Sequence, residues 1–220
     1  MLKHYISIAR PDHWFKNIFM LPGVVLAFKY ANQAVTMELL VQLLLAVVSV
    51  CLIASANYVI NEWLDAEFDQ FHPVKKNRPS VTQGLKAKWV YFEYVLLAIV
   101  GLSIAYTISL PYFVTSFLLL FMGFMYNVRP FRTKDRIYLD VVSESINNPL
   151  RFCLGWFVIT SLVPPSSILL SYWMGGAFLM GAKRFAEFRF INDATVAGLY
   201  RKSFKFYDEK KLLISTVFYA

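Results

Sequence analysis

The chain has 220 residues, of which 58% are hydrophobic and 17% aromatic, and its mean hydropathy is +0.50. This apolar weight excludes an ordinary soluble domain, whose surface must meet water. The formal net charge of +8 would favour a nucleic-acid partner in a soluble protein. In a membrane protein it is typical of cytoplasmic loops rich in Lys and Arg, so we expect contact with membrane lipid and not with nucleic acid.

Six apolar stretches follow one another along the chain, and each is long enough, with its flanks, to cross the roughly 30 Å hydrocarbon core as a helix. They cover residues 15–30, 39–60, 89–110, 112–126, 139–163 and 168–183. A seventh apolar run begins at Leu212. Tight turns are expected at Pro111 and at Pro164-Pro165. The sequence therefore predicts an all-α integral membrane protein, a multi-helix transmembrane bundle with six spans and the start of a seventh.

The basic residues predict the orientation of this bundle. Of the 22 Lys and Arg, only Lys29 and Arg151 lie outside the N-terminal arm and the segments that follow the second, fourth and sixth spans. By the positive-inside rule these segments are cytoplasmic. We expect a multi-pass protein of the cell (inner) membrane with its active site on the cytoplasmic side.

The second span ends in a polar stripe in which Asn57, Asn61, Asp65 and Asp69 recur every four residues. This spacing places them along one side of a helix. Two carboxylates one turn apart, with an Asn amide behind them, are oxygen ligands suited to Mg²⁺. A solvated helix end with ordinary Asp residues is the alternative, but polar groups at the membrane boundary are costly unless they are used.

Basic residues follow directly after this stripe, at Lys75, Lys76 and Arg78. They could bind the phosphates that a metal bridges, although any cytoplasmic loop collects Lys and Arg. His72 precedes a proline at the helix exit, and we interpret it as an interfacial residue and not as a metal ligand. The end of the fourth span repeats the pattern with Tyr126, Arg132 and Lys134.

The fifth span carries polar residues along nearly one face, namely Asp140, Glu144, Asn147, Asn148 and Arg151, with Pro149 as the expected site of a kink. Pairing of Glu144 with Arg151 could simply hold helices together. Polar groups inside a membrane span nevertheless indicate function by default. We therefore expect this face to line a cavity.

The sixth span ends in Lys183, Arg184 and Glu187. A local salt bridge between Lys183 and Glu187, which are four residues apart, is one interpretation. The other is a second group of cations and carboxylate that faces the end of the second span. Two such helix ends would enclose a metal-bound diphosphate.

The stripe on the second span resembles the signature of the UbiA superfamily of intramembrane transferases, Asn-Asp-x-x-Asp-x-x-x-Asp. Here it reads Asn61-Glu62-x-x-Asp65-x-x-x-Asp69, with Glu in the second place. The segments Arg10-Pro11-x-x-Trp14-x-Lys16-Asn17 and Tyr126-x-x-x-Pro130-Phe131-Arg132-x-Lys134 are similar to that superfamily as well. Three further segments look most like its polyprenyl-phosphate phosphoribosyltransferase branch: His72-Pro73-x-Lys75-x-x-Arg78-Pro79, Lys183-Arg184-x-x-Glu187 and Arg201-Lys202-Ser203.

This resemblance implies a nine-helix bundle around a lipid-accessible cavity, so we expect residues 1–220 to form a single domain that lacks its C-terminal part. It also implies Mg²⁺-dependent displacement of diphosphate from a donor, with a lipid-soluble acceptor. The expected catalytic residues are Asp65, Asp69, Lys183 and Glu187, and the expected metal ligands are Asn61, Asp65 and Asp69. The expected substrate-binding residues are Asn57, Asn61, Lys75, Lys76, Arg78, Tyr126, Arg132, Lys134, Arg151 and Arg184.

Two donors remain open at this stage. Phosphoribosyl diphosphate, with a polyprenyl phosphate as acceptor, is favoured because its second phosphorylated position needs additional cations. A prenyl diphosphate with an aromatic or other lipid-soluble acceptor is the alternative. A transporter or channel is the alternative from another class, since buried charges can mark an ion path.

Overall fold

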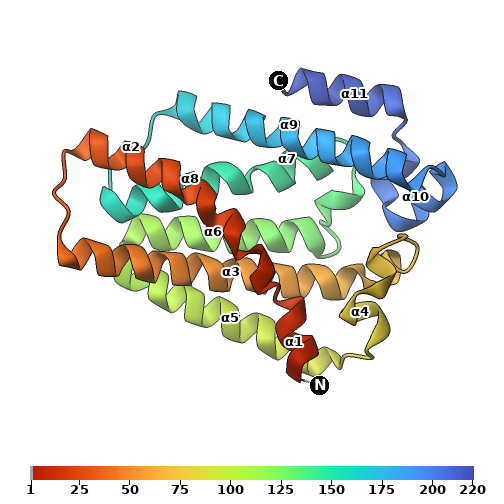
Figure 1. The fold of residues 1–220 in the computed structure, drawn as a ribbon, viewed down its shortest axis with the longest axis horizontal. Coiled ribbons are helices and arrows are strands. Elements are labelled where there is room, and N and C mark those ends of the chain that lie inside the picture. Colours follow the sequence, from red (N-terminus) through yellow and green to blue (C-terminus); the bar gives the residue numbers. More distant parts are fainter. Residues whose placement is uncertain (1) are drawn as a thin grey trace.

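The computed structural model describes residues 2–220, and within that range it contains helices and connecting segments but no strand. The longer helices lie roughly side by side along the long axis of the molecule (Figure 1). They are α2 (Leu21–Ala31), α3 (Met37–Asp69), α5 (Ala87–Ile108), α6 (Leu110–Asn127), α8 (Asn147–Ile159), α9 (Ser166–Ile191) and α11 (Glu209–Phe218). The shorter helices are α1 (Leu2–Ile8), α4 (Pro79–Thr82), α7 (Leu139–Ser145) and α10 (Ala194–Tyr200), and the 3-10 helices are η1 (Pro11–Met20), η2 (Lys75–Asn77), η3 (Thr133–Asp135) and η4 (Lys202–Lys205).

Helix α3 lies at the centre of the bundle and contacts α5, α6 and α8. Small or hydroxyl-bearing residues allow these close approaches, and their side chains bond to neighbouring backbones. Ser49 Oγ donates to the carbonyl oxygen of Gly101 at 2.8 Å, and Tyr112 OH donates to that of Ala46 at 2.8 Å. Such bonds satisfy polar groups that would otherwise be costly in an apolar environment.

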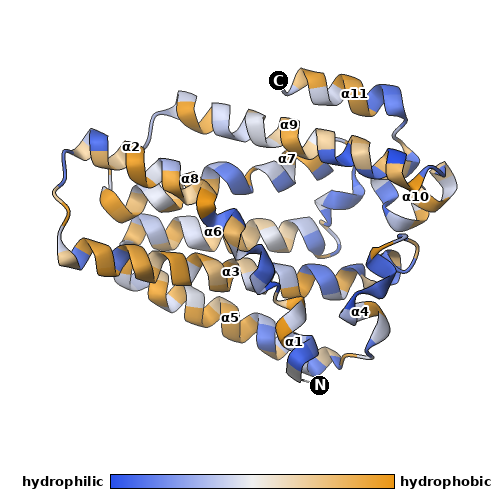
Figure 2. Cartoon of the chain, in the orientation of Figure 1, coloured by the Kyte–Doolittle hydropathy of each residue, from blue (hydrophilic) through white to orange (hydrophobic). Residues whose placement is uncertain are grey.

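Three helices, α3, α5 and α6, are long and apolar enough to cross a membrane. Figure 2 shows that apolar residues cover much of the length of α3 and α5. Many apolar side chains of α5 point outward, including Phe92 at 56% and Ile99 at 58% exposure. This distribution is expected where hydrocarbon replaces water as the solvent. It supports the predicted all-α membrane bundle, while the count of six spans stays a prediction.

Two predicted spans are not continuous α-helices. Residues 15–30 are divided between the 3-10 helix η1 and α2, and residues 139–163 between α7 and α8, which are separated by Ile146. Proline cannot donate a backbone hydrogen bond, and its ring conflicts with the carbonyl four residues earlier. The break at Ile146 lies three residues before Pro149, close to the kink that the sequence predicted.

The polar connections gather at one end of the bundle, which we call the charged end: α1, α4, η2, η3, α10 and η4. Figure 1 places the labelled members α1, α4 and α10 at the right, and Figure 2 shows hydrophilic residues concentrated there. Contacts between α1 and α4, between η3 and η4, and between α10 and α3 hold these segments together. The bundle thus brings together the basic segments that follow the second, fourth and sixth predicted spans.

Candidate active site

The first part of the site lies at the C-terminal end of α3 and is called the Asp65 group: Asn61, Asp65, Asn127, Arg132 and Lys134. Asp65 accepts a hydrogen bond from Arg132 Nη2 at 2.8 Å and forms an ion pair with Lys134. Asn127, the last residue of α6, accepts from Asn61 Nδ2 at 2.5 Å and from Lys134 Nζ at 2.6 Å. The connection after α6 therefore supplies the cations that neutralise Asp65, and Asn127 at the end of α6 links Asn61 to Lys134.

One helical turn later, Asp69 is almost fully buried and accepts a hydrogen bond from Arg78 Nη1 at 2.6 Å. Arg78 comes from the connection after α3, which folds back toward the helix that precedes it. Glu62 is also buried, and it is 3.4 Å from Ser80 Oγ rather than beside Asp65. The two predicted metal ligands Asp65 and Asp69 are thus each held by cations from a different connection.

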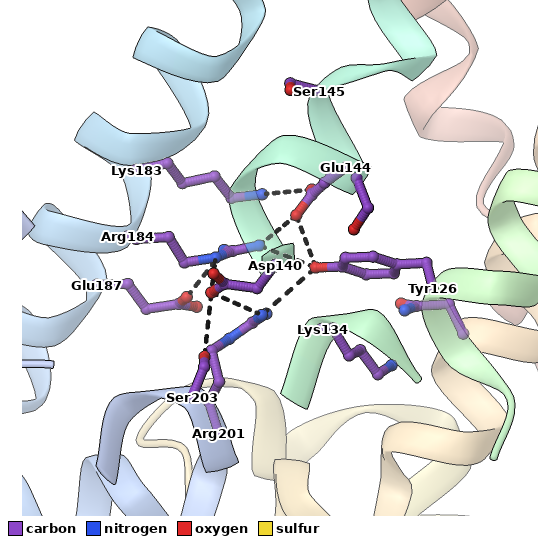
Figure 3. Close-up of polar contacts among 12 residues, drawn as sticks. Tyr126, Lys134, Asp140, Glu144, Ser145, Lys183, Arg184, Glu187, Arg201 and Ser203 are labelled. Atoms are coloured by element: carbon purple, nitrogen blue, oxygen red, sulfur yellow. Dashed lines mark hydrogen bonds and ion pairs between the residues drawn. The ribbon is translucent and has the colours of Figure 1, made fainter. Parts of the chain in front are cut away.

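A second part, the Arg184 group, consists of Tyr126, Asp140, Glu144, Arg184 and Arg201 (Figure 3). Arg184 of α9 is 1% exposed and forms an ion pair with Glu144 of α7, and its Nε is 3.6 Å from Asp140 Oδ2. Tyr126 OH donates to Glu144 at 2.7 Å and accepts from Arg184 Nη2 at 3.0 Å. Arg201 Nη1 is 3.4 Å from the same hydroxyl. A buried guanidinium with several acceptors fixes the relative positions of α6, α7 and α9.

A third part, the Glu187 group, consists of His72, Lys75, Glu187 and Tyr200. Glu187 accepts hydrogen bonds from Lys75 Nζ at 2.5 Å and from Tyr200 OH at 3.0 Å. His72 is buried, and its Nδ1 accepts from the backbone N–H groups of Val74 and Lys75. The other ring nitrogen of His72, Nε2, lies 3.6 Å from Glu187 Oε1. His72 thus accepts hydrogen bonds from the connection that carries Lys75, while its position at the membrane interface stays a prediction.

These three parts are adjacent. Lys134 Nζ lies 5.5 Å from the centre of the Tyr126 ring, which joins the Asp65 and Arg184 groups. Arg184 Nη1 lies 3.3 Å from Glu187 Oε2, which joins the Arg184 and Glu187 groups. The ends of α3 and α9 therefore face one continuous polar site, as their sequences predicted.

Burial affects the cations that connect these parts. It lowers the pKa of the Lys134 ammonium to about 8, although the charge of Asp65 opposes the shift. It also lowers the pKa of Lys75, against the opposing charge of Glu187. Because these ammonium groups are poorly solvated, an added anion would stabilise their charge. The arrangement is suited to binding a phosphorylated ligand.

Four predicted site residues lie apart from these groups or at their edge. Asn57 donates from Nδ2 to the Leu119 carbonyl at 2.9 Å and so faces α6. Lys76 is exposed. Arg151 donates from Nε to Asn17 Oδ1 at 3.0 Å, not to Glu144. Lys183 is half-exposed and 3.7 Å from Glu144, so the local pair with Glu187 is not formed.

The residues present fit Mg²⁺ in the chemistry of their donors. Asn61, Asp65 and Asp69 offer hard oxygen atoms from one side of α3. Residues 2–220 contain no group of three or more His, Cys, Asp or Glu side chains placed to hold a metal by themselves. Mg²⁺ commonly takes one or two carboxylates and completes its coordination with substrate phosphate oxygens and water. The site therefore fits the ion together with a phosphorylated substrate.

Several residues of the site could not be identified as functional from the sequence. Asp140 was noticed only as part of a polar stripe, yet it is fully buried and accepts from Ser203 Oγ at 3.0 Å and Tyr207 OH at 2.9 Å. The feature that could have identified Asp140 is the presence of an acidic residue within an apolar run. Tyr200 and Asn127 carried no comparable signal, because their roles depend on contacts between distant segments.

Comparisons with known proteins find similar sequences and similar folds. The sequence model described as the UbiA prenyltransferase family matches residues 18–219. A decaprenyl-phosphate phosphoribosyltransferase of Mycolicibacterium smegmatis is 27% identical over 211 residues, which cover 94% of this chain and 63% of that protein. A protein of the same name from Corynebacterium glutamicum is 28% identical, with 92% of this chain and 59% of that protein covered. This chain thus spans less than two thirds of the length of these relatives.

Among solved structures, a UbiA homolog from Archaeoglobus fulgidus bound to DMAPP and Mg²⁺ is similar to this chain with a TM-score of 0.78. The two are 20% identical, and the alignment covers 98% of this chain and 73% of the other. A structure described as digeranylgeranylglyceryl phosphate synthase has a TM-score of 0.70 at 16% identity, with coverage of 99% and 73%. At these identities the similarity concerns the fold. Both solved structures are helical bundles, and the alignment covers about three quarters of each of them.

Proposed function

The chain belongs to the UbiA prenyltransferase family, and from that premise we propose that it is part of a membrane transferase that displaces diphosphate from its donor. The donor is phosphoribosyl diphosphate, and the acceptor is a polyprenyl phosphate. The relatives named decaprenyl-phosphate phosphoribosyltransferase support this choice, because their similarity covers more than nine tenths of the chain. The resemblance in the Asn61-to-Asp69 segment predicted the same family.

The observation that carries the proposal is the hydrogen bond from Lys75 to Glu187. It joins the connection after α3 to α9. Three cations, Arg78, Arg132 and Lys134, pair with the α3 carboxylates Asp69 and Asp65. Three more, Lys75, Arg184 and Arg201, pair with the neighbouring carboxylates Glu187 and Asp140. Phosphoribosyl diphosphate carries a 5-phosphate in addition to its diphosphate. Separate cationic groups suit two phosphorylated positions, whereas a prenyl diphosphate presents hydrocarbon at its second position.

In the proposed reaction the bond between C1 of the ribose and the diphosphate oxygen breaks, and its electron pair leaves with the diphosphate. A phosphate oxygen of the acceptor forms the new bond to C1. Asn61, Asp65 and Asp69 would hold Mg²⁺, which when bound there neutralises charge on the leaving diphosphate. Lys134, Arg132 and Arg78 already lie beside these carboxylates and share that charge as it develops.

Other predicted residues have supporting parts in this proposal. Glu187 orients Lys75 and Arg184, so that it acts as a positioning residue. Lys183 is half-exposed at the edge of the site and can meet an anion that enters there. Tyr126 holds Glu144 and Arg184 in place through its hydroxyl. The substrate-binding roles of Asn57, Lys76 and Arg151 stay predictions.

A prenyl donor is the second candidate. It is favoured by the fold shared with the Archaeoglobus fulgidus homolog, whose structures contain DMAPP or GPP with Mg²⁺. Membranes that contain the protein can be given labelled phosphoribosyl diphosphate or a labelled prenyl diphosphate, followed by lipid extraction. Label in a phosphorylated lipid from the first donor supports the proposal. Label from the prenyl donor, with phosphoribosyl diphosphate neither consumed nor competing, would contradict it.

We also propose that the charged end faces the cytoplasm and that the protein resides in the cell (inner) membrane. The basic residues gathered at that end support the first statement. A water-soluble donor made in the cytoplasm would then reach Asp65 and Asp69 without crossing the membrane. The acceptor would approach from within the bilayer.

A further inference from the structure

A second group of basic side chains surrounds the start of the bundle, where η1 crosses α3 and α8. We call it the Lys16 cluster: Arg10, His13, Lys16 and Arg151. Asn17, which follows Lys16, is buried and accepts the hydrogen bond from Arg151 Nε at 3.0 Å. Lys16 Nζ lies 5.7 Å from the centre of the Tyr58 ring of α3. The cluster is therefore fixed by contacts with both neighbouring helices.

The contacts of His13 show that this cluster lacks acceptors. Arg10 Nη2 lies 2.7 Å from His13 Nε2, and Lys16 Nζ lies 3.0 Å from His13 Nδ1. Both cations direct N–H groups at the ring, but a neutral imidazole has one acceptor nitrogen. Burial, with the nearby charges of Lys16 and Arg10, lowers the pKa of His13 to about 4. At neutral pH the ring is thus uncharged and satisfies at most one of the two donors.

Within residues 2–220, the exposed carboxylate of Asp12 is the only one at ion-pair distance from a member of the cluster. In the same range, neither Lys16 nor Arg151 has a carboxylate at ion-pair distance. The Asp12 side chain is 65% exposed, and its carboxylate lies 3.7 Å from Arg10 Nη2 and 3.4 Å from His13 Nε2. Glu144, the other nearby acid, is already held by Arg184. Cations that are partly buried without a counter-charge favour binding of an anion.

Apolar side chains of the same segment lie next to these cations. Trp14, Phe15, Ile18 and Leu21 are 41%, 69%, 64% and 54% exposed. In a chain of this family, such residues face the hydrocarbon of the bilayer or a ligand within it. A ligand that combines a phosphate with a long hydrocarbon tail matches both features. Free phosphoribosyl diphosphate matches only the first.

We propose that the Lys16 cluster binds the phosphate monoester of the lipid-soluble acceptor, with the apolar side chains of η1 and α2 along its tail. This inference rests on the proposed function for the identity of the acceptor. Arg151 Nη1 lies 3.4 Å from the carbonyl oxygen of Asn147, and Asn147 Nδ2 donates to the carbonyl oxygen of Glu144 at 3.0 Å, whose carboxylate lies 3.7 Å from Lys183 Nζ. The cluster therefore adjoins the polar site through Arg151, Asn147 and Glu144, and the acceptor phosphate would meet the donor there.

Equilibrium binding to the purified chain in detergent tests the site without requiring transfer. The probes are labelled polyprenyl phosphate and the corresponding polyprenol. We expect the wild-type chain to prefer the phosphate, and Lys16→Gln to weaken phosphate binding by about 10-fold or more, as loss of a charge-assisted hydrogen bond does. Polyprenol binding should stay within about twofold. Lys88→Gln, which removes an exposed cation of α5 at the same end, is the matched control and should behave as wild type.

Further binding measurements show which phosphorylated ligand the Lys16 cluster binds: the acceptor, the donor or any anionic lipid. Binding of phosphoribosyl diphosphate should be the same in Lys16→Gln and wild type, whereas its selective loss would assign the cluster to the donor and overturn the inference. Equal competition by phosphatidic acid would reveal a general anionic-lipid site, which also contradicts it. Normal binding of polyprenyl phosphate by a folded Lys16→Gln chain would also contradict the inference. If wild-type protein binds polyprenyl phosphate through Lys16 but transfers no phosphoribosyl group, the proposed function fails while the site stands.

Discussion

Lys75 Nζ donates a hydrogen bond to Glu187 Oε1 at 2.5 Å, although the two residues are 112 positions apart in the sequence. Lys75 belongs to the connection after α3 and Glu187 to α9, so this one contact joins the two helix ends that carry the predicted chemistry. His72 and Tyr200 support it from either side. The site is consequently assembled by the fold of the connections and not by the long helices alone.

The first prediction concerns the α3 carboxylates. Asp65→Asn and Asp69→Asn should each reduce turnover by about 100-fold or more, because each removes a negative charge needed to hold Mg²⁺ and the substrate diphosphate. Glu67→Gln is the matched control, since Glu67 lies on the same helix but is exposed and paired with Arg129. Diphosphate release, measured for protein that elutes as a single peak, checks this. Near-normal diphosphate release by both Asp variants would contradict the assignment of Asp65 and Asp69 as metal ligands.

The second prediction concerns Arg184, which is buried between Glu144 and Glu187. Arg184→Met should destabilise the bundle by about 3–5 kcal/mol, because it leaves buried carboxylates without their cation. Combining it with Glu144→Gln should recover part of that loss. Arg189→Met, at an exposed position of the same helix, should have little effect. Thermal unfolding in detergent measures all three, and equal stability of Arg184→Met and Arg189→Met would show that the buried network does not stabilise the fold.

The sequence predicted the class of fold because long apolar runs and one-sided charge follow directly from the bilayer. It predicted Asp65 and Asp69 because carboxylates at a fixed helical spacing are a local pattern. It did not predict that Asn127 joins Asn61 to Lys134, or that His72 is buried against Tyr200. These contacts depend on how distant connections meet, and no periodicity along one helix encodes that meeting.

The third prediction tests the packing of α3 against α6. A Cβ at Gly123 would overlap the Asn57 side chain, which donates to the Leu119 carbonyl. Gly123→Ala should therefore cost about 1–3 kcal/mol of stability. The double variant Gly123→Ala, Asn57→Ala should be more stable than Gly123→Ala alone, because the obstructing amide is gone.

Gly175→Ala is the control for that comparison. A Cβ at Gly175 meets no atom within 4 Å, and alanine favours a helix over glycine by roughly 1 kcal/mol. It should leave thermal stability in detergent unchanged or slightly raised. If Gly123→Ala is as stable as Gly175→Ala, the close approach of α6 to Asn57 is not present in solution.

The fourth prediction concerns topology. In a background without Cys51 and Cys153, Lys205→Cys at the charged end should resist an impermeant thiol reagent added to intact cells, and should react after lysis. Gln33→Cys, which is exposed in the connection between α2 and α3 at the opposite end, should react in intact cells. The reason is the concentration of Lys and Arg at the charged end. The reverse labelling pattern would invert the proposed orientation.

The most direct test of the account is transfer by the purified protein. Phosphoribosyl diphosphate labelled in its ribose is incubated with polyprenyl phosphate and Mg²⁺, and the lipid fraction is extracted and counted. The account predicts labelled phosphoribosyl lipid and an equal amount of free diphosphate, with both abolished by chelation of Mg²⁺ and by Asp65→Asn. A folded wild-type protein that leaves the ribose label in the aqueous phase, but transfers a prenyl group from a prenyl diphosphate under the same conditions, would contradict it.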